Sequence, residues 1–279
     1  MGETPWNVFI SRTNTIFVTS RHIGSIVIWD NESTVPTRNI TDNLHQPYGL
    51  FGTNNGDIYI DNGLSNYRVE KWTANATGYT TAMHVCASCQ GLFIDINDNL
   101  HCTLNTMHQV IVKSLNDRMN IWKVEAGIGV AGSTPSTLRG PRGIYVDIYL
   151  SLYVADSLNN RIQKFAFGQL NGTTVVGSGP SGVVGISLAS PAAITMDADG
   201  YLFICDQNKH RIVGSDRYGF RCIVACSGFT RSGPAGLSFP RSLDFDSYGN
   251  LYVVDYNNSR FQKFLLTQNS CGKVDLFRI

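Results

Sequence analysis

The chain contains 279 residues, of which 43% are hydrophobic and 15% are charged, and its formal net charge at pH 7 is +1. This composition supplies a sizeable core and excludes a general electrostatic attraction to nucleic acid or anionic lipid, leaving at most a local basic patch. No apolar run approaches the ~18 residues of a membrane-spanning helix, so membrane insertion is not expected.

Short apolar or alternating runs separated by turn residues recur along the chain, in groups that open with proline or, once, with cysteine. Such runs predict short β-strands. The opening residues are, in chain order, Pro5, Pro47, Cys89, Pro141, Pro191 and Pro240. In the fourth group, strands are expected at 144–146, 152–155 and 161–165. Outer strands fit the gaps at 79–85, 121–125, 173–176 and 220–225.

The groups repeat every 42 to 52 residues, a period in the range of four-stranded propeller blades. The predicted fold is all-β, a single six-bladed β-propeller over residues 1–279 with four antiparallel strands per blade. The blades are expected at about 5–45, 46–87, 88–139, 140–189, 190–238 and 239–279. Because Pro5 already opens the innermost strand of blade one, blade six must use 274–279 as its own outer strand. Blades one and six should then meet through side chains alone.

A sequence signature accompanies these strands and is most complete between Gly140 and Phe165. It consists of Pro-x-Gly, an apolar strand ending in Asp, a Gly or Asn turn, Leu-Tyr-Val-x-Asp, and Asn-x-Arg-Ile-x-x-Phe. The signature resembles the NHL-repeat family of β-propellers across essentially the whole chain, and best in blades four, five and six. The resemblance implies the propeller fold but little about chemistry, because one ring architecture supports unrelated functions.

Aspartate and arginine recur together at the turn between the second and third strands. The pairs are Asp156 with Arg161, Asp206 with Arg211, Asp255 with Arg260 and, at a looser spacing, Asp61 with Arg68. A catalytic role would require one copy to differ from the others, and none does. We therefore expect structural, bidentate ion pairs that fix the loop.

Two further patterns resemble metal sites. Acidic turns begin at Asp95, Asp197 and Asp246, but they lack the later bidentate carboxylate of a calcium loop, so Asx-turns are expected. His22, His108 and His210 fall in equivalent loops of alternate blades, which would separate them by roughly 20 Å, too far for one zinc ion. We expect exposed loop histidines and predict no metal, cofactor or catalytic residue.

Seven cysteines leave at least one unpaired within the chain. A local disulfide is expected in the third blade, either Cys86–Cys89 or a bond to Cys102. Cys222 and Cys226 can pair only if the outer strand bulges or turns there. Cys205 should pack in the core, and Cys271 should be free. Together with five glycosylation sequons, which begin at Asn31, Asn39, Asn75, Asn171 and Asn257, these features favour the secretory route.

One position varies from blade to blade while its surroundings repeat. The residue after each opening proline should lie at one mouth of the central channel, and these residues are Trp6, Tyr48, Gln90, Arg142, Ala192 and Arg241. Aromatic, arginine and amide side chains on a rigid rim are typical of partner-binding surfaces. The predicted binding residues are therefore Trp6, Tyr48, Gln90, Arg142 and Arg241.

The sequence thus predicts a non-catalytic binding platform for protein, peptide or glycan. We expect a monomeric domain, extracellular or secreted as part of a larger chain. The resemblance implies two alternatives. One is an intracellular (cytoplasmic) recognition domain that binds RNA or ubiquitin-ligase substrates, although Arg139, Arg142, Arg231 and Arg241 make only a patch and nucleic acid is not expected. The other is a metal-dependent lyase or lactonase.

Overall fold

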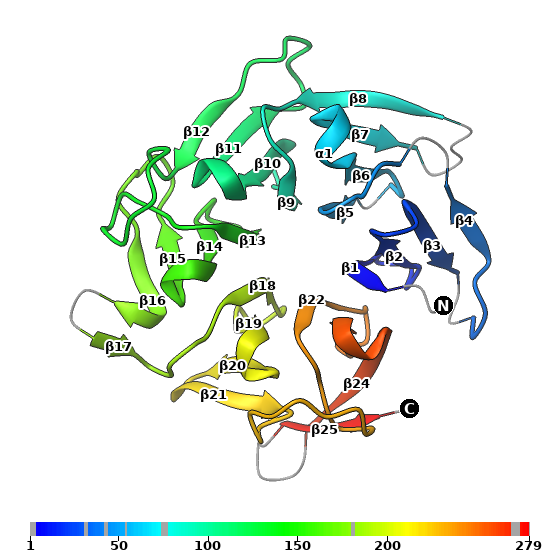
Figure 1. Ribbon diagram of the computed structural model, residues 1–279, viewed down its shortest axis with the longest axis vertical. Helices are drawn as coiled ribbons and strands as arrows, with labels where there is room; N and C mark the ends of the chain where they lie inside the picture. The colour runs from blue at the N-terminus through cyan, green and yellow to red at the C-terminus, as the bar shows by residue number, and fades with distance from the viewer. Residues whose placement is uncertain are drawn as a thin grey trace.

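Six antiparallel sheets stand radially around a central axis in the computed structural model (Figure 1), which confirms the predicted six-bladed propeller. The structure describes residues 4–30, 33–41, 44–53, 55–73, 78–179, 182–268 and 274–278. Within each blade, the strands follow one another outwards from the axis in chain order. The strands of each sheet fall within one of the six expected ranges.

The first three blades have four strands each. Blade one contains β1 (Pro5–Ile10), β2 (Ile16–Ser20), β3 (Ser25–Trp29) and β4 (Arg38–Ile40). Blade two contains β5 (Leu50–Gly52), β6 (Ile58–Asp61), the short helix α1 (Gly63–Asn66), β7 (Arg68–Trp72) and β8 (Tyr79–His84). Blade three contains β9 (Cys89–Ile94), β10 (Asn99–Leu104), the 3₁₀ helix η1 (Asn105–Met107), β11 (Gln109–Ser114) and β12 (Lys123–Ala126).

The last three blades place a 3₁₀ helix between their second and third strands. Blade four contains β13 (Pro141–Val146), β14 (Leu152–Asp156), η2 (Ser157–Asn159), β15 (Arg161–Phe165), β16 (Thr173–Gly179) and β17 (Gly182–Val184). Blade five contains β18 (Pro191–Met196), β19 (Leu202–Asp206), η3 (Gln207–Lys209), β20 (Arg211–Asp216) and β21 (Gly219–Val224). Blade six contains β22 (Pro240–Phe245), β23 (Leu251–Asp255), η4 (Tyr256–Asn258), β24 (Arg260–Gln268) and β25 (Val274–Arg278). The fifth strand of blade four, β17, was not expected.

Glycines near the start of the inner strands let neighbouring blades approach closely. A Cβ atom added to Gly91 would lie 2.6 Å from the carbonyl oxygen of Arg142 in the next blade. One added to Gly143 would lie 2.6 Å from the Cα atom of Ala193. Real Cβ atoms do not approach backbone this closely, which explains why glycine recurs in the Pro-x-Gly signature.

The ring closes between blades one and six without a shared strand. Among the described residues, β25 pairs with β24 and so completes blade six from its own tail, as predicted. Asn7 and Ser242 stand where other blades have glycine or alanine, and the Ser242 hydroxyl lies 2.7 Å from Asn7 Oδ1 and 3.3 Å from the Val8 nitrogen. Asp244 Oδ2 accepts a hydrogen bond of 2.8 Å from the backbone N–H of Ile10. Polar side chains of β22 therefore satisfy backbone donors of β1.

Removing the Ser242 hydroxyl should weaken this closure. Ser242→Ala leaves the Val8 N–H without its acceptor, and we expect the free energy of unfolding to fall by about 1–3 kcal/mol. Ser88 is a matched control, since both serines are 7% exposed and the Ser88 hydroxyl has no hydrogen-bond partner among the described residues. Urea unfolding should show a clearly smaller loss for Ser88→Ala, and equal losses would contradict this account of the closure.

Two disulfides are present among the described residues. Cys89 bonds Cys102 across β9 and β10, and Cys222 bonds Cys226. The second bond forms because the chain turns after β21, where Ala225 has a φ of 54°. Cys86 is free and exposed, so the alternative Cys86–Cys89 bond is wrong. Cys205 is free and buried, and Cys271 lies outside the described residues.

The buried disulfide should contribute more to stability than the outer one. Cys89 and Cys102 are 13 residues apart, whereas Cys222 and Cys226 are 4 apart. Loop-closure entropy then predicts losses of about 3 and about 2 kcal/mol when each pair is replaced by alanine. Burial of the first pair adds a packing loss, because both of its cysteines are fully buried. Urea unfolding of the two double variants measures both values, and a larger loss for the outer pair would contradict the prediction.

Candidate binding site at the channel mouth

A cavity of about 350 Å³ follows the axis of the ring. Four of the five predicted binding residues line it, namely Trp6, Gln90, Arg142 and Arg241. The fifth, Tyr48, is buried beside them at 7% exposure, with its ring centroid 5.4 Å from that of Trp6. All five directly follow the proline or cysteine that opens their blade, so they belong to the same end of the channel.

Two residues outside the predicted set complete an arginine–aromatic cluster. The guanidinium carbon of Arg241 lies 3.7 Å from the ring centroid of Trp6 and 4.0 Å from that of Tyr256. Arg21 lies over the ring of Tyr48 at 4.3 Å and donates a hydrogen bond of 2.5 Å to its hydroxyl. We use the name mouth cluster for Trp6, Arg21, Tyr48, Arg142, Arg241 and Tyr256.

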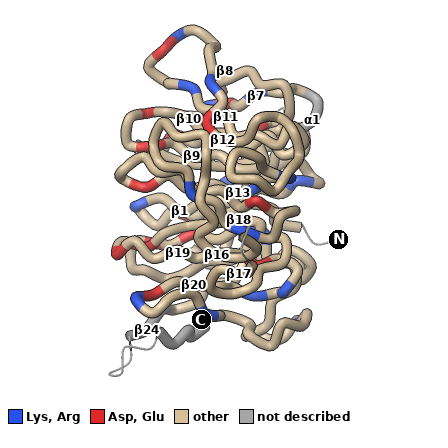
Figure 2. The backbone as a smooth tube through the Cα atoms, turned by 90° about the vertical axis from the view of Figure 1, so that its left-hand side faces the viewer, with Lys and Arg blue, Asp and Glu red and all other residues tan. Residues whose placement is uncertain are grey.

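The three arginines of the mouth cluster have no carboxylate partner in the part of the chain that the structure describes. No ion pair among the described residues includes Arg21, Arg142 or Arg241. Arg142 donates instead to the neutral Gln207 Oε1, and Arg241 Nε is buried without a hydrogen-bond partner. Burial, followed by the positive charge of Arg142, lowers the pKa of Arg241 to about 10. Along the side of the ring that faces the viewer in Figure 2, acidic and basic residues are interspersed.

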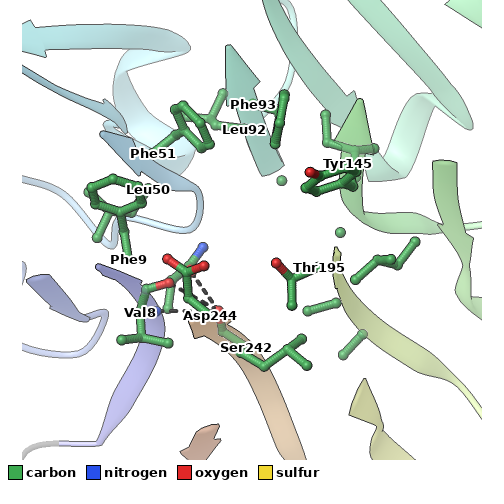
Figure 3. A pocket seen from close by; sticks show the side chains of 18 of the residues that line it. Val8, Phe9, Leu50, Phe51, Leu92, Phe93, Tyr145, Thr195, Ser242 and Asp244 are labelled. Atoms are coloured by element: carbon green, nitrogen blue, oxygen red, sulfur yellow. Dashed lines mark hydrogen bonds between the residues drawn. The ribbon is translucent and has the colours of Figure 1, made fainter. Parts of the chain in front are cut away.

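Further along the channel, the fifth residue counted from the opening proline or cysteine of each blade forms a second layer (Figure 3). We name it the fifth-position ring, and its members are Phe9, Phe51, Phe93, Tyr145, Thr195 and Asp244. The first four bring aromatic rings from consecutive blades into contact, with centroids 5.4, 4.8 and 4.9 Å apart. Burial raises the pKa of Asp244 to about 7.

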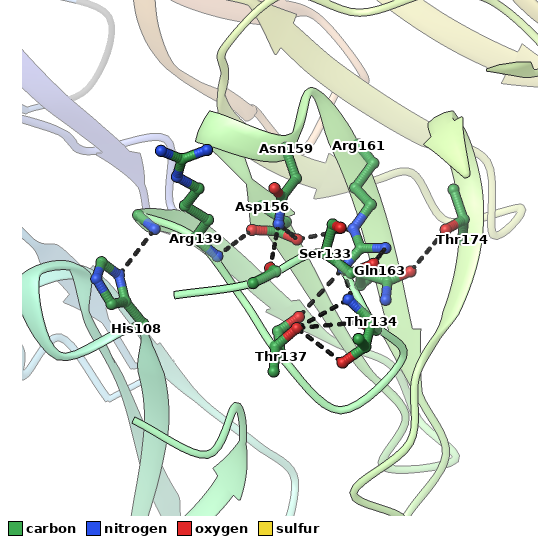
Figure 4. Close-up of polar contacts among 12 residues, drawn as sticks. His108, Ser133, Thr134, Thr137, Arg139, Asp156, Asn159, Arg161, Gln163 and Thr174 are labelled. Atoms are coloured by element: carbon green, nitrogen blue, oxygen red, sulfur yellow. Dashed lines mark hydrogen bonds and ion pairs between the residues drawn. The ribbon is translucent and has the colours of Figure 1, made fainter. Parts of the chain in front are cut away.

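The repeated aspartates and arginines fix the loops between blades (Figure 4). Arg161 Nε lies 2.7 Å from Asp156 Oδ2, and the other Arg161 donors bind carbonyl oxygens of Ser133, Thr134 and Thr137. Arg211 and Arg260 repeat the Nε contact, each 2.8 Å from its aspartate. The expected bidentate geometry is wrong, because each arginine gives one N–H to the carboxylate and others to the preceding loop.

The expected Asp61–Arg68 pair does not form. Blade four pairs Asp156 opposite Arg161, whereas blade two pairs Asp61 opposite Val69, because the turn containing α1 is three residues longer. Arg68 therefore binds Glu70, with Nη2 2.7 Å from Oε1. Asp61 accepts hydrogen bonds from the backbone of Cys89 and Gly63, and burial raises its pKa to about 7.

The histidines and acidic turns have structural roles. His108 and His210 adopt φ values of 56° and 51°, and their Nδ1 atoms accept hydrogen bonds from backbone N–H groups of the following blade. Both are half-buried, so the expectation of exposed histidines holds only for His22. The turns at Asp95, Asp197 and Asp246 are Asx-turns, as expected; each Oδ1 accepts from backbone N–H groups two and four residues later.

Two sequence positions could have revealed the residues that were missed. Arg21, Gln207 and Tyr256 each follow the last residue of the second strand of their blade. Like the residue after the opening proline, this position varies between blades. Asp244 is the one acid at the fifth position of an inner strand, and it becomes apparent only when the blades are aligned by register.

Within the described ranges, no group of three or more His, Cys, Asp or Glu residues is arranged to hold a metal ion. None of the helices described is long and apolar enough to span a membrane.

Comparison with known families agrees with the fold. The NHL repeat model matches residues 237–264. This match confirms the resemblance noted from the sequence: the chain is a six-bladed β-propeller with an NHL repeat in its last blade. No curated protein sequence matches the chain.

Solved structures share this fold at low sequence identity. An auxiliary nutrient binding protein from Bacteroides thetaiotaomicron is 13% identical, with a TM-score of 0.71 over 94% of this chain and 68% of that one. A streptogramin B lyase is 13% identical, with a TM-score of 0.67 over 100% and 84%. A chain of a nidogen/laminin complex is 18% identical, with a TM-score of 0.64 over 92% and 91%. At these identities the likeness establishes the propeller fold alone.

Proposed function

We propose that this chain is a non-catalytic binding propeller whose mouth cluster binds an acidic segment of a protein or peptide. The observation that carries the proposal is a set of three arginines at one end of the channel that have no carboxylate partner among the described residues. Two of them, Arg21 and Arg241, pack against aromatic rings. A carboxylate entering the mouth would supply the missing counter-charge and accept charge-assisted hydrogen bonds from donors such as Arg241 Nε.

The cluster is suited to binding because it is held in place before a ligand arrives. Trp6 packs edge-on against both Tyr48 and Tyr256, and Arg241 lies between two of these rings. Arginine and aromatic side chains dominate the energetics of protein interfaces, and preorganised groups lose less entropy on binding. The lowered pKa of Arg241 indicates that its charge is poorly solvated, which favours an incoming anion.

An extracellular location is part of the proposal. Two disulfides are characteristic of oxidising compartments. Three of the five sequons, at Asn39, Asn171 and Asn257, have exposed asparagines, and the other two lie outside the described residues. Intact mass of the natively expressed protein, before and after glycosidase and reductant, tests this directly. A mass equal to that of the bare, reduced chain would contradict an extracellular location.

The structural neighbours support binding without naming a ligand. One is a nutrient binding protein and another belongs to a complex of nidogen with laminin. Because another neighbour is a streptogramin B lyase, an enzymatic role is the alternative to a binding role.

Fluorescence anisotropy with a labelled hexaglutamate peptide tests the proposed function. We expect saturable, salt-sensitive binding that weakens at least tenfold in Arg241→Gln and in Arg142→Gln. Arg118→Gln removes an exposed arginine near the opposite ends of the inner strands and should bind as the wild type does. Equal binding by all variants, or equal binding of hexalysine, would contradict the proposal. Preference for a sulfated oligosaccharide over the peptide would overturn the peptide assignment in favour of an anionic glycan.

A further inference from the structure

The fifth-position ring is a part of the channel that the mouth function does not use. Each member lies three residues after the residue that follows the opening proline or cysteine of its blade. This separation is about 10 Å at the usual strand rise. Its composition is asymmetric, with aromatic side chains from four consecutive blades and a carboxylate from the sixth.

Asp244 is a half-buried carboxylate that lines this cavity and has no cationic partner among the described residues. Its Oδ2 accepts from the Ile10 N–H at 2.8 Å and its Oδ1 from the Phe245 N–H at 2.9 Å. No ion pair within the described residues includes Asp244. An ionised carboxylate can accept about four hydrogen bonds, so two backbone donors leave capacity for a ligand.

The aromatic members have a spacing that suits a cation on the axis. Neighbouring centroids among Phe9, Phe51, Phe93 and Tyr145 are 4.8 to 5.4 Å apart. In a regular hexagon, the distance from the centre to each corner equals the distance between neighbouring corners. Six side chains in this arrangement would each lie about 5 Å from the axis, which is within the ~6 Å range of cation–π attraction. A cation at the centre would therefore meet several rings and the Asp244 carboxylate together.

We propose that the fifth-position ring binds an organic ammonium group, in which Asp244 supplies the counter-charge and the aromatic residues supply the apolar wall. Aromatic side chains are poor ligands for hard metal ions, which prefer several oxygen atoms, whereas they attract alkylated ammonium groups. Ile10, Met196 and Phe245, each one residue beyond the ring on its strand, also line the cavity, so the cavity continues past the ring on the side away from the three arginines. The proposal rests on residues distinct from the mouth cluster.

Choline and its neutral isostere, in which carbon replaces the quaternary nitrogen, are suitable probes. Ligand-observed NMR titration of the wild type should show saturable choline binding and weaker binding of the isostere. Asp244→Asn should weaken choline at least tenfold and leave the isostere unchanged, because the amide keeps an oxygen for the Ile10 N–H but removes the charge. Phe93→Leu should weaken choline severalfold with Asp244 intact.

The controls separate this site from the mouth and from a metal site. Arg241→Gln should bind choline as the wild type does, even if it loses the acidic peptide. Thermal unfolding of Asp244→Asn verifies that this variant remains folded. The proposal is overturned if the wild type does not bind choline, if Asp244→Asn and Phe93→Leu bind it unchanged, or if the neutral isostere binds as tightly as choline. Displacement of choline by equimolar calcium would also overturn it, in favour of a metal site.

Discussion

Arg161→Ala is expected to lower the free energy of unfolding by about 3–5 kcal/mol. The Arg161 side chain is 2% exposed and the Asp156 side chain is fully buried, so removing the guanidinium leaves a buried carboxylate without its counter-charge. The variant also leaves three loop carbonyl oxygens without their donors. Urea unfolding followed by circular dichroism measures the loss.

Two other arginines calibrate this result. Arg260 makes the same Nε contact but its side chain is 24% exposed, so Arg260→Ala should cost less than Arg161→Ala. Arg221 pairs with Asp216 at the surface, with a side chain that is 46% exposed, and Arg221→Ala should cost less than about 1 kcal/mol. If Arg161→Ala costs no more than Arg221→Ala, the aspartate–arginine contact does not hold the loop between blades.

The stability of the protein should fall as the pH rises from about 6.5 to about 9, because of His101. This buried side chain binds Asp95 through Nε2 at 3.0 Å and Glu125 through Nδ1 at 2.6 Å. Burial disfavours its charged form, but the two carboxylates outweigh burial and raise the pKa of His101 from 6.5 to about 9. The folded protein therefore holds a proton that the unfolded chain releases. The corresponding stability is complete below pH 6.5 and is lost through pH 9, by about 3 kcal/mol.

Urea unfolding at a series of pH values between 6 and 9.5 measures this loss. Comparison with His101→Gln, which lacks the titrating group, isolates the contribution of His101. The exposed His22 is the matched control, and His22→Gln should keep the pH dependence of the wild type. At acid pH, stability depends on Asp95. Burial raises the pKa of this carboxyl, but hydrogen bonds with His101 and Asn99 outweigh burial and lower the pKa to about 2. Its stabilisation is present above pH 3.8 and is lost as the pH falls through 2. A wild-type protein with unchanged stability from pH 6 to 9.5 would contradict the assignment of a charged His101.

Local signals in the sequence predicted the architecture because each blade repeats the same short-range pattern. Proline opens five of the six blades, alternating residues form the sheets, and aspartate ends the second strand of blades two, four, five and six. The pairing of β25 with β24 agrees with the prediction that 274–279 supplies the outer strand of blade six. The spacing of seven residues between Asp61 and Arg68, instead of five, also indicated that the turn in blade two differs, and there Asp61 pairs with Val69.

The site was less accessible to sequence reasoning because it depends on contacts between blades. Arg21 reaches Tyr48 of the next blade, and Tyr256 reaches Trp6 across the ring closure. No periodicity within one blade records such contacts. Asp244 lies between the apolar residues Leu243 and Phe245, so its place on the axis follows from its register in the ring and not from the local pattern.

A crystal structure of the protein with hexaglutamate bound would test most directly whether the mouth cluster is the binding site. We predict a peptide carboxylate at about 2.7–2.9 Å from a nitrogen of Arg241 or Arg142, lying against Trp6. Peptide located elsewhere on the propeller, with the three arginines still lacking an anionic partner at a saturating concentration, would contradict the proposed function.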